Sequence, residues 1–226
     1  KTDYERVLKQ RNALLKSSYV ARKNNQDSVL ATLDIWNEQL VNLGSQITFQ
    51  RNQLINDLLP YVSKAYAELA PSSKALNIKY LPNVSSFEMT LDDLKIKMGE
   101  KIKERQLDEL DRGLTLVGPH RDDVEISIGE LPGKGYASHG ESWSVALALK
   151  LASFDLLKAN SRAGDPVLVL DDVFAELDTT RRNQLISRLN SVEQVLITAA
   201  VKEDVPSELG GKKLFVTNGQ VNEINE

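Results

Sequence analysis

The sequence predicts an α/β protein in which a helical, coiled-coil-like arm precedes a lobe built on a largely parallel sheet. In the first half, apolar residues recur every three or four positions over long stretches, which is the spacing of a helix face. After Arg112, short apolar runs alternate with helical segments, an order typical of α/β lobes. We therefore expect a helical arm with a small strand element over residues 1–112 and a C-terminal lobe over residues 113–226.

Composition limits the class of protein. Of the 226 residues, 41% are hydrophobic, which is enough for a sizeable core, and 27% are charged, which is typical of soluble proteins. The sequence has no cysteine for disulfides or thiolate metal sites, and its two histidines are too few for a histidine metal cluster. Apolar runs are much shorter than a membrane span and the first residues do not form a signal peptide, so we expect a cytoplasmic protein with no membrane partner.

The arm is expected to begin with two helices. The first covers residues 3–22. The second starts at Ser28 and ends at about Leu59, before Pro60, because apolar residues recur there in steps of four and three, the pattern of a coiled-coil seam. A less certain helical stretch follows Pro60.

Strands and helices alternate in the rest of the chain. The strand formers of LNIKYL predict a short strand, and Thr90 can cap a third helix that ends at Arg112. Beyond it, continuous apolar runs predict buried parallel strands, and an Asn-Gly pair predicts a hairpin. In order, the lobe is expected to contain strands at LTLVG (114–118) and VEISIG (124–129), a buried helix at 141–158, a strand at PVLVL (166–170) covered on both faces, a helix at 179–190, a strand at QVLIT (194–198) and a hairpin around Asn218-Gly219.

Two carboxylates follow directly after the run VLVL. Asp171 would lie at the carboxyl end of a strand, where open α/β sheets place their ligands, and could hold Mg²⁺. Asp172 would face the other way along the pleat and could orient or deprotonate a water. The alternative is a strand that simply ends in a polar loop. The acidic Glu-Leu-Asp that follows before a helix favours the Mg²⁺ interpretation.

The segment SHGE, residues 138–141, precedes the expected buried helix. Backbone N–H groups at a helix start attract phosphate, Gly140 would let a phosphate approach, and Ser138 adds a hydroxyl donor. Ser138 and Glu141 also match a capping box, so the segment alone leaves both interpretations open. The Asp-Asp pair downstream favours phosphate binding.

A phosphate-binding P-loop is not found in this sequence. The pattern needs Gly, four residues and Gly-Lys-Ser/Thr, which neither Gly133-Lys134 nor Gly211-Lys212 completes. Half of a nucleotide site is therefore present, and the chain opens at Lys1 in what reads as the middle of a helix. We expect a fragment of a longer protein that does not bind ATP tightly by itself.

Basic residues are concentrated in residues 1–23, although the net charge of the chain is −4. A basic helix could contact nucleic acid through Arg11, Lys16 and Lys23. The alternative is a solvated helix face, the commoner use of such charges. His120 and Arg121, in GPHRDD, are also open to two interpretations: contact with nucleotide, SHGE or DNA, or a turn held by hydrogen bonds to the backbone.

Five segments, in the same order, resemble the bacterial RecF family of recombination-repair proteins: YERVLKQRNALLK, GPHRDDVEISIG, SHGESWSVALALKLAS, VLVLDDVFAELDTTRRNQL and QVLITAA. The resemblance covers nearly the whole chain. The family is similar to the ATPase heads of SMC and Rad50 proteins, which are related to ABC ATPases. The resemblance implies that the helical arm and the second lobe of an ABC-type ATPase head are present, and that the first lobe, with the P-loop, is missing.

The resemblance also implies roles for individual residues. Asp171 matches the Walker B aspartate of the Mg²⁺ site, and Asp172 stands where relatives often carry a catalytic glutamate. The signature, which contacts the nucleotide of the opposite subunit, matches Ser138, Gly140 and Glu141. The dimer-facing aspartate of the D-loop matches Asp178. The chain departs from the family pattern at three places: Glu141 replaces the usual glutamine, Ser142-Trp143 replaces Gln-Arg, and Thr198-Ala199 provides no switch histidine. The missing histidine implies a slow ATPase.

The function implied by the resemblance is DNA repair, within replication, recombination and the SOS response. A full-length protein of this kind is expected to bind ATP and Mg²⁺, to be a weak ABC-type ATPase, and to form an ATP-dependent homodimer. It would bind DNA at junctions between single-stranded and duplex DNA and, with RecO and RecR, help to load RecA; the fragment alone would be inactive. The alternative is a structural or partner-binding arm like those of SMC and Rad50, whose arms run to hundreds of residues, whereas a few tens are expected here.

Overall fold

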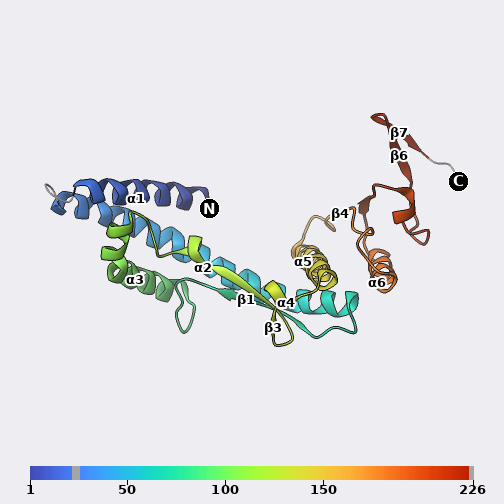
Figure 1. The fold of residues 1–226 in the computed structure, drawn as a ribbon, viewed down its shortest axis with the longest axis horizontal. Coiled ribbons are helices and arrows are strands. Elements are labelled where there is room, and N and C mark those ends of the chain that lie inside the picture. The colour runs from blue at the N-terminus through green and yellow to red at the C-terminus, as the bar shows by residue number, and fades with distance from the viewer. Residues whose placement is uncertain (22–25, 224–226) are drawn as a thin grey trace. The chain divides into compact units, whose positions relative to one another are not determined.

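The computed structural model describes residues 1–21 and 26–223, and the side chains among them outside residues 18–30. The chain forms two compact units: unit 1 comprises Lys1–Pro60 and Asn77–Lys134, and unit 2 comprises Tyr61–Leu76 and Gly135–Glu226. The α/β class is confirmed, since long helices combine with strands that include a parallel pair (Figure 1). Residues 113–134 pack with the N-terminal part of the chain, and the division at Arg112 stays a prediction.

Three helices build most of unit 1: α1 (Thr2–Ala21), α2 (Gln26–Leu69) and α3 (Leu91–Arg112). The expected end of the second helix at Pro60 is wrong, because α2 continues to Leu69 with Pro60 inside it. The residues after Pro60 have a reason to stay helical: Val62, Tyr66 and Leu69 are buried at helical spacing, and this burial outweighs the lost backbone hydrogen bond. The expected cap of α3 is confirmed, since the Thr90 hydroxyl accepts a hydrogen bond from the Asp93 N–H.

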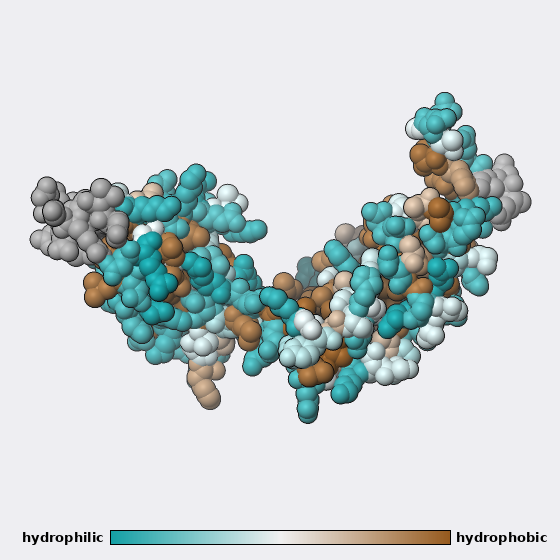
Figure 2. All heavy atoms as spheres, viewed as in Figure 1, coloured by the Kyte–Doolittle hydropathy of each residue, from teal (hydrophilic) through white to brown (hydrophobic). Residues whose placement is uncertain are grey.

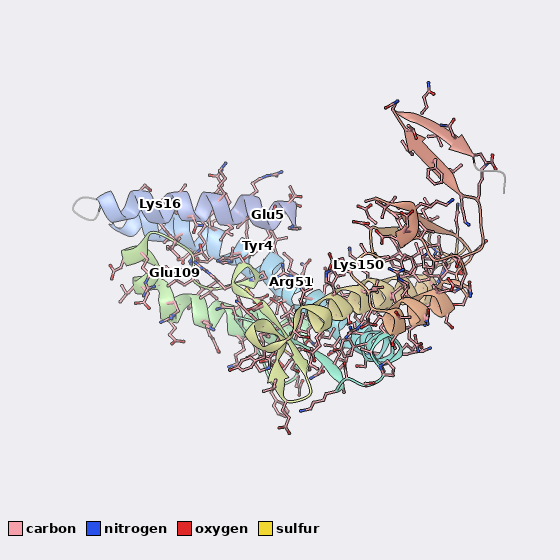
Figure 3. All side chains as sticks on the ribbon, turned by 45° about the vertical axis from the view of Figure 1, so that its right-hand side comes forward. Tyr4, Glu5, Lys16, Arg51, Glu109 and Lys150 are labelled. Carbon is pink, nitrogen blue, oxygen red and sulfur yellow. The ribbon has the colours of Figure 1, made fainter. Side chains whose placement is uncertain are left out.

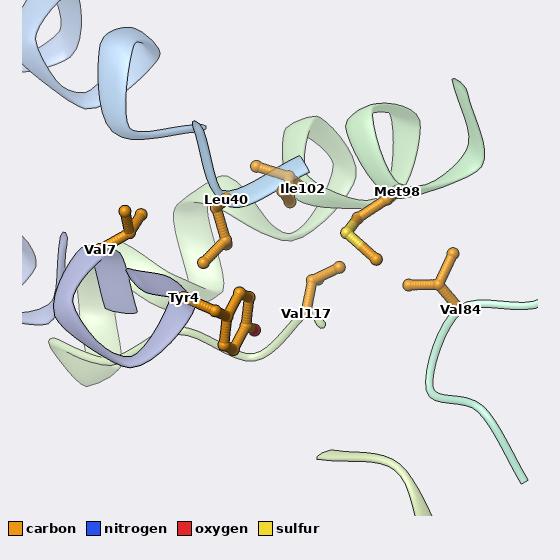
Figure 4. Packing of buried hydrophobic residues seen from close by; sticks show 7 residues of the cluster. All are labelled: Tyr4, Val7, Leu40, Val84, Met98, Ile102 and Val117. Carbon is orange, nitrogen blue, oxygen red and sulfur yellow. The ribbon is translucent and has the colours of Figure 1, made fainter. Parts of the chain in front are cut away.

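A hydrophobic cluster joins the three helices of unit 1. Tyr4 and Val7 of α1, Leu40 of α2 and Met98 and Ile102 of α3 meet there with Val84 and Val117 (Figure 4). Gly44 makes this approach possible, because a Cβ at that position would lie 2.9 Å from the sulfur of Met98. The apolar stripe of α2 thus serves the packing of helices within this unit.

The expected strand at LTLVG is wrong. Residues 114–118 are irregular, and their backbone bonds to side chains in place of a neighbouring strand. Asn12 Oδ1 accepts from the Thr115 N–H at 2.7 Å, and Glu109 Oε1 accepts from the Leu116 N–H at 2.6 Å. These contacts connect the segment to α1 and α3.

The centre of this network is the buried ion pair between Arg11 and Glu109, both fully buried, with Nη2 and Oε2 2.5 Å apart. Arg11 also donates to Asn37 of α2 and to Thr115, each at 2.8 Å. One guanidinium therefore contacts groups from α2, α3 and the irregular segment. Figure 3 labels Glu109 on α3.

The strands of unit 1 form one small sheet. Its order is β1 (Leu76–Leu81), β2 (Asp123–Ile128) and β3 (Leu131–Pro132), with β2 and β3 antiparallel. Between α3 and β2 the chain makes the short helix η1 (Pro119–Arg121). The strand expected at LNIKYL is thus confirmed, and the strand expected at VEISIG corresponds to β2.

Unit 2 carries the parallel strands. It contains α4 (Gly133–Tyr136, which starts at the boundary), α5 (His139–Asn160), β4 (Leu168–Asp171), α6 (Thr179–Leu189), β5 (Val195–Thr198), η2 (Lys202–Asp204), β6 (Leu214–Thr217) and β7 (Gln220–Glu223). β4 and β5 pair in parallel with Asp171 opposite Thr198. Leu168 and Leu170 are buried, as are Leu151 of α5 and Leu185 of α6.

The expectation that the run PVLVL is covered on both faces is wrong for the part of the chain that the structure describes. Val167 and Val169 are 48% and 61% exposed, and Leu196 on β5 is 52% exposed. Successive side chains of a strand point to opposite faces. Because Leu168 and Leu170 point into the core, Val167 and Val169 point to the other face and are exposed. The hairpin expected at Asn218-Gly219 is confirmed, both residues having positive φ, and β6 and β7 expose apolar side chains (brown, Figure 2).

No helix among the described residues is long and apolar enough to cross a membrane.

We expect Arg11→Met to lower the free energy of unfolding of the chain by about 3–5 kcal/mol, because it leaves Glu109 buried without its cation. Chemical denaturation followed by circular dichroism measures this. The matched control is Lys16→Met, an exposed position on the same helix, which should change the unfolding free energy by less than about 0.5 kcal/mol. Equal effects of the two substitutions would contradict the structural importance of the pair.

Candidate functional site

Asp171 is the last residue of β4, and its carboxylate is exposed at the carboxyl end of the strand, as the sequence predicts. The parallel register places it opposite Thr198, whose hydroxyl donates a hydrogen bond to Asp171 Oδ1. Among residues 1–21 and 26–223, no group donates a hydrogen bond to the second carboxylate oxygen. An oriented, solvent-exposed carboxylate is therefore available for a ligand at this edge.

Asp172 adopts a left-handed backbone, with φ of 52°, and its N–H donates to the Thr198 carbonyl at 3.1 Å. Asp and Asn tolerate this conformation better than most residues. The positive φ turns the chain out of the strand, and the side chain is exposed. Two adjacent exposed carboxylates thus lie at the end of the strand.

Mg²⁺ fits this chemistry, although the described residues contain no group of three or more acidic or histidine side chains that could hold a metal by themselves. Magnesium is usually held by one or two carboxylates, with waters and substrate phosphates completing its shell. Asp171 would supply the protein ligand. When bound, the ion would neutralise phosphate charge.

Ser138 and Glu141 form the capping box of α5. The Ser138 hydroxyl accepts from the Glu141 N–H at 3.3 Å, and the Ser138 N–H donates to Glu141 Oε2 at 2.9 Å. Hydrogen bonds from the Ser138 backbone and hydroxyl lower the pKa of Glu141, so its carboxylate stays charged. Ser138 and Glu141 therefore cap α5, and Ser138 remains exposed at the start of the helix.

Asp178 caps α6 in the same manner. Its Oδ1 accepts from the Arg181 N–H at 2.9 Å, and its Oδ2 lies 2.5 Å from Arg181 Nη1. The Arg181 guanidinium also lies against Gly140, where a Cβ would come within 3.2 Å of Nη1. The starts of α5 and α6 are thereby brought together.

A second contact joins the same two segments. His139 Nε2 lies 3.6 Å from Glu176 Oε2, and both side chains are exposed. Arg182 donates to the Phe174 carbonyl at 2.9 Å and fixes the segment between β4 and α6. The structure thus brings Ser138, Gly140 and Glu141 close to Asp178. Sequence reasoning missed Arg181, whose only signal is its place three residues after a capping aspartate.

No family model matches the chain. Among curated proteins, a "DNA replication and repair protein RecF" of Streptomyces avermitilis is 48% identical over 225 residues, covering 99% of this chain and 60% of the relative. A protein of the same name from Cutibacterium acnes is 46% identical over 234 residues, covering 98% of this chain and 59% of the relative. The chain is homologous to RecF. It spans about 60% of the length of these relatives.

A solved structure described as the recombination mediator protein RecF-ATPrS in the RecFOR pathway also matches this RecF homologue. The TM-score is 0.80 with 27% identity, and the match covers 98% of this chain and 57% of that chain. The resemblance to RecF that the sequence motifs predict is thus confirmed in both sequence and fold.

The GPHRDD loop of this RecF homologue is held from several sides. His120 contacts the Tyr4 hydroxyl through Nδ1 at 2.7 Å and the Thr115 carbonyl through Nε2 at 3.1 Å. Arg121 donates to the same carbonyl at 3.1 Å. These contacts support the interpretation of both residues as parts of a stabilised turn. Tyr4 is labelled in Figure 3, on α1.

Asp122 connects this turn to the sheet and to α2. Its carboxylate accepts from the Tyr80 hydroxyl and, at 2.7 Å, from the Asn83 N–H, and it lies 3.3 Å from Arg51 Nη1. Arg51 also donates to the Pro119 carbonyl at 2.7 Å. Desolvation raises the pKa of the Tyr80 hydroxyl, and the bond to Asp122 raises it further.

The three candidate DNA contacts have different outcomes. Arg11 is wrong as a surface contact, because its guanidinium is fully buried and paired with Glu109. Lys16 is exposed on α1 and keeps its proposed role (labelled in Figure 3). Lys23 lies outside the described residues.

We expect His120 to make unfolding pH-dependent. Desolvation, and then the charge of Arg121, lower the pKa of His120 below its usual 6.5. The unfolded chain therefore binds the proton first, so the stability contribution is complete above pH 6.5 and is lost as the pH falls towards the folded-state pKa. Chemical denaturation from about pH 7.5 to about pH 5.5 should show the stability advantage of the wild type over His120→Gln shrinking. Parallel pH profiles would contradict this.

Proposed function

We propose that this chain supplies the signature, Walker B and D-loop segments of an ATP-dependent DNA repair protein of the RecF type. The observation that carries the proposal is the contact between the starts of α5 and α6, where Gly140 packs on Arg181 and Arg181 pairs with Asp178. ABC-type dimers need these two segments on one surface, facing the partner's nucleotide.

The nucleotide role of each residue is proposed from the resemblance to RecF, and its environment supports that role. Asp171 is exposed at the strand end and would bind Mg²⁺, while Asp172 would orient the attacking water. Ser138 and Gly140, at the N-terminus of a 22-residue helix, would approach the phosphates of ATP bound mainly by a second copy. Glu141 adds negative charge there, and β5 ends in Thr198 with no histidine following, so slow turnover is the expected behaviour.

The DNA-related part of the proposal concerns the full-length protein. We infer ATP-dependent DNA binding at junctions of single-stranded and duplex DNA, and loading of RecA together with RecO and RecR. Lys16 on α1 is the described residue that would contribute to phosphate contacts. The net charge of −4 is consistent with weak DNA binding by this chain alone.

In the full-length protein, we expect Ser138→Arg to abolish dimerisation driven by a non-hydrolysable ATP analogue, because the side chain adds bulk and charge where the γ-phosphate would lie. Sedimentation velocity measures the dimer. Two controls separate other causes: Ser138→Ala removes the hydroxyl, which forms the cap, at about 1 kcal/mol, and is a proposed phosphate donor, but adds neither bulk nor charge, and Ser153→Arg places the same charge on an exposed site of α5. Both controls should dimerise, and full dimerisation of Ser138→Arg would reduce SHGE to a helix cap.

Asp172→Asn in the full-length protein should bind ATP normally and hydrolyse it about 100-fold more slowly, the usual contribution of a general base. Asparagine also tolerates the positive φ of this position, so the backbone is expected to be unchanged. Steady-state turnover and ATP titration give the two quantities. Turnover equal to the wild type would remove Asp172 from the water-orienting role.

A further inference from the structure

Arg181 contacts two segments that lie about forty residues apart in the sequence. Its backbone N–H and its Nη1 both bind the carboxylate of Asp178, which fixes the first turn of α6. Its guanidinium carbon and both terminal nitrogens lie within 3.2–3.7 Å of the position that a Cβ of Gly140 would occupy. The planar group therefore packs against the backbone of α5 where Gly140 leaves room.

The burial of this side chain argues against a purely local ion pair. The Arg181 side chain is only 23% exposed, and its Nε is buried with no hydrogen-bond partner among the described residues. Leaving a buried donor unpaired costs free energy, so an arginine that served only Asp178 would keep Nε in water. Packing against α5 is the interaction that offsets this cost.

The charges around α5 fit the same arrangement. The positive charge of Arg181 acts on the carboxylate of Glu141, one residue after Gly140. His139, the residue before Gly140, lies near Glu176. Each segment thus presents one carboxylate and one positively charged or chargeable group to the other segment, so the two are complementary: Glu141 and His139 lie on α5, and Glu176 and Arg181 on the α6 side.

We propose that Arg181 is a positioning residue that makes the start of α5 and the segment 176–178 move as one body. The role of this coupling in assembly rests on the proposed function: a phosphate that contacts Ser138 or Gly140 would then also set the position of Asp178. Gly140 is required in this account because any larger side chain would displace the guanidinium.

Amide hydrogen exchange on the 226-residue chain tests the coupling without any nucleotide. Arg181→Ala should speed exchange of the Glu141 and Ser142 amides, which lie on the other segment, by about tenfold or more. The matched control is Arg182→Ala, which removes a neighbouring arginine that binds the Phe174 carbonyl and should leave α5 unchanged. Faster exchange confined to α6 would overturn the proposal.

Gly140→Ala gives an independent test from the other side of the contact. Alanine normally stabilises a helix relative to glycine, so a local effect alone would slow exchange. Coupling predicts faster exchange of the Arg181 and Arg182 amides, both of which donate to Asp178. Unchanged exchange at these two amides would overturn the proposal even if Arg181→Ala did not fold.

Dimerisation of the full-length protein with a non-hydrolysable ATP analogue distinguishes the proposed function from the proposed role of Arg181. We expect Arg181→Ala to weaken the dimer at least about tenfold and Arg182→Ala to leave it within about twofold. A wild-type protein that does not dimerise would overturn the proposed function, while the exchange data would still decide the coupling. Altered exchange with unchanged dimerisation would overturn the assembly role of Arg181.

Discussion

The first turns of α5 and α6 leave backbone N–H groups that need acceptors, and the side chains that meet this need arrange the candidate site. Ser138 with Glu141, and Asp178 alone, cap the two helices. The caps place carboxylates at adjacent helix starts, and Arg181 lies between them. The same constraint acts in unit 1, where Asn12 and Glu109 accept hydrogen bonds from the N–H groups of Thr115 and Leu116. The residues that cap α5 and α6 are thus the same residues that are proposed to contact a nucleotide.

Features encoded by neighbouring residues could be predicted from the sequence, and features that depend on distant partners could not. The cap at Thr90, the capping box of α5 and the hairpin at Asn218-Gly219 depend on residues within four positions of one another. Three features depend on partners 41 to 103 positions away: the buried Arg11, the irregular segment at 114–118 and the contact of Arg181 with Gly140. A basic residue on a helix is read as exposed unless its distant partner is known, which is why the assignment of Arg11 to a DNA surface was wrong.

The exposed carboxylates at the end of β4 and the residues at the starts of α5 and α6 would have different roles in the candidate site. Asp171 and Asp172 are exposed, Asp171 is held by Thr198, and the two would serve a metal and a water. Ser138, Gly140 and Asp178 are held by hydrogen bonds and packing and would serve recognition of a second copy's nucleotide. In a symmetric dimer each site would thus combine the Walker B residues of one copy with the signature of the other.

Mixing two inactive variants of the full-length protein tests this combination most directly. Asp171→Asn damages the metal side of a site, and Ser138→Arg damages the signature side. If each site uses both copies, a mixed dimer contains one intact site, and an equal mixture should recover up to about a quarter of wild-type ATP turnover. No recovery, in a mixture shown to contain the mixed dimer, would contradict the shared site.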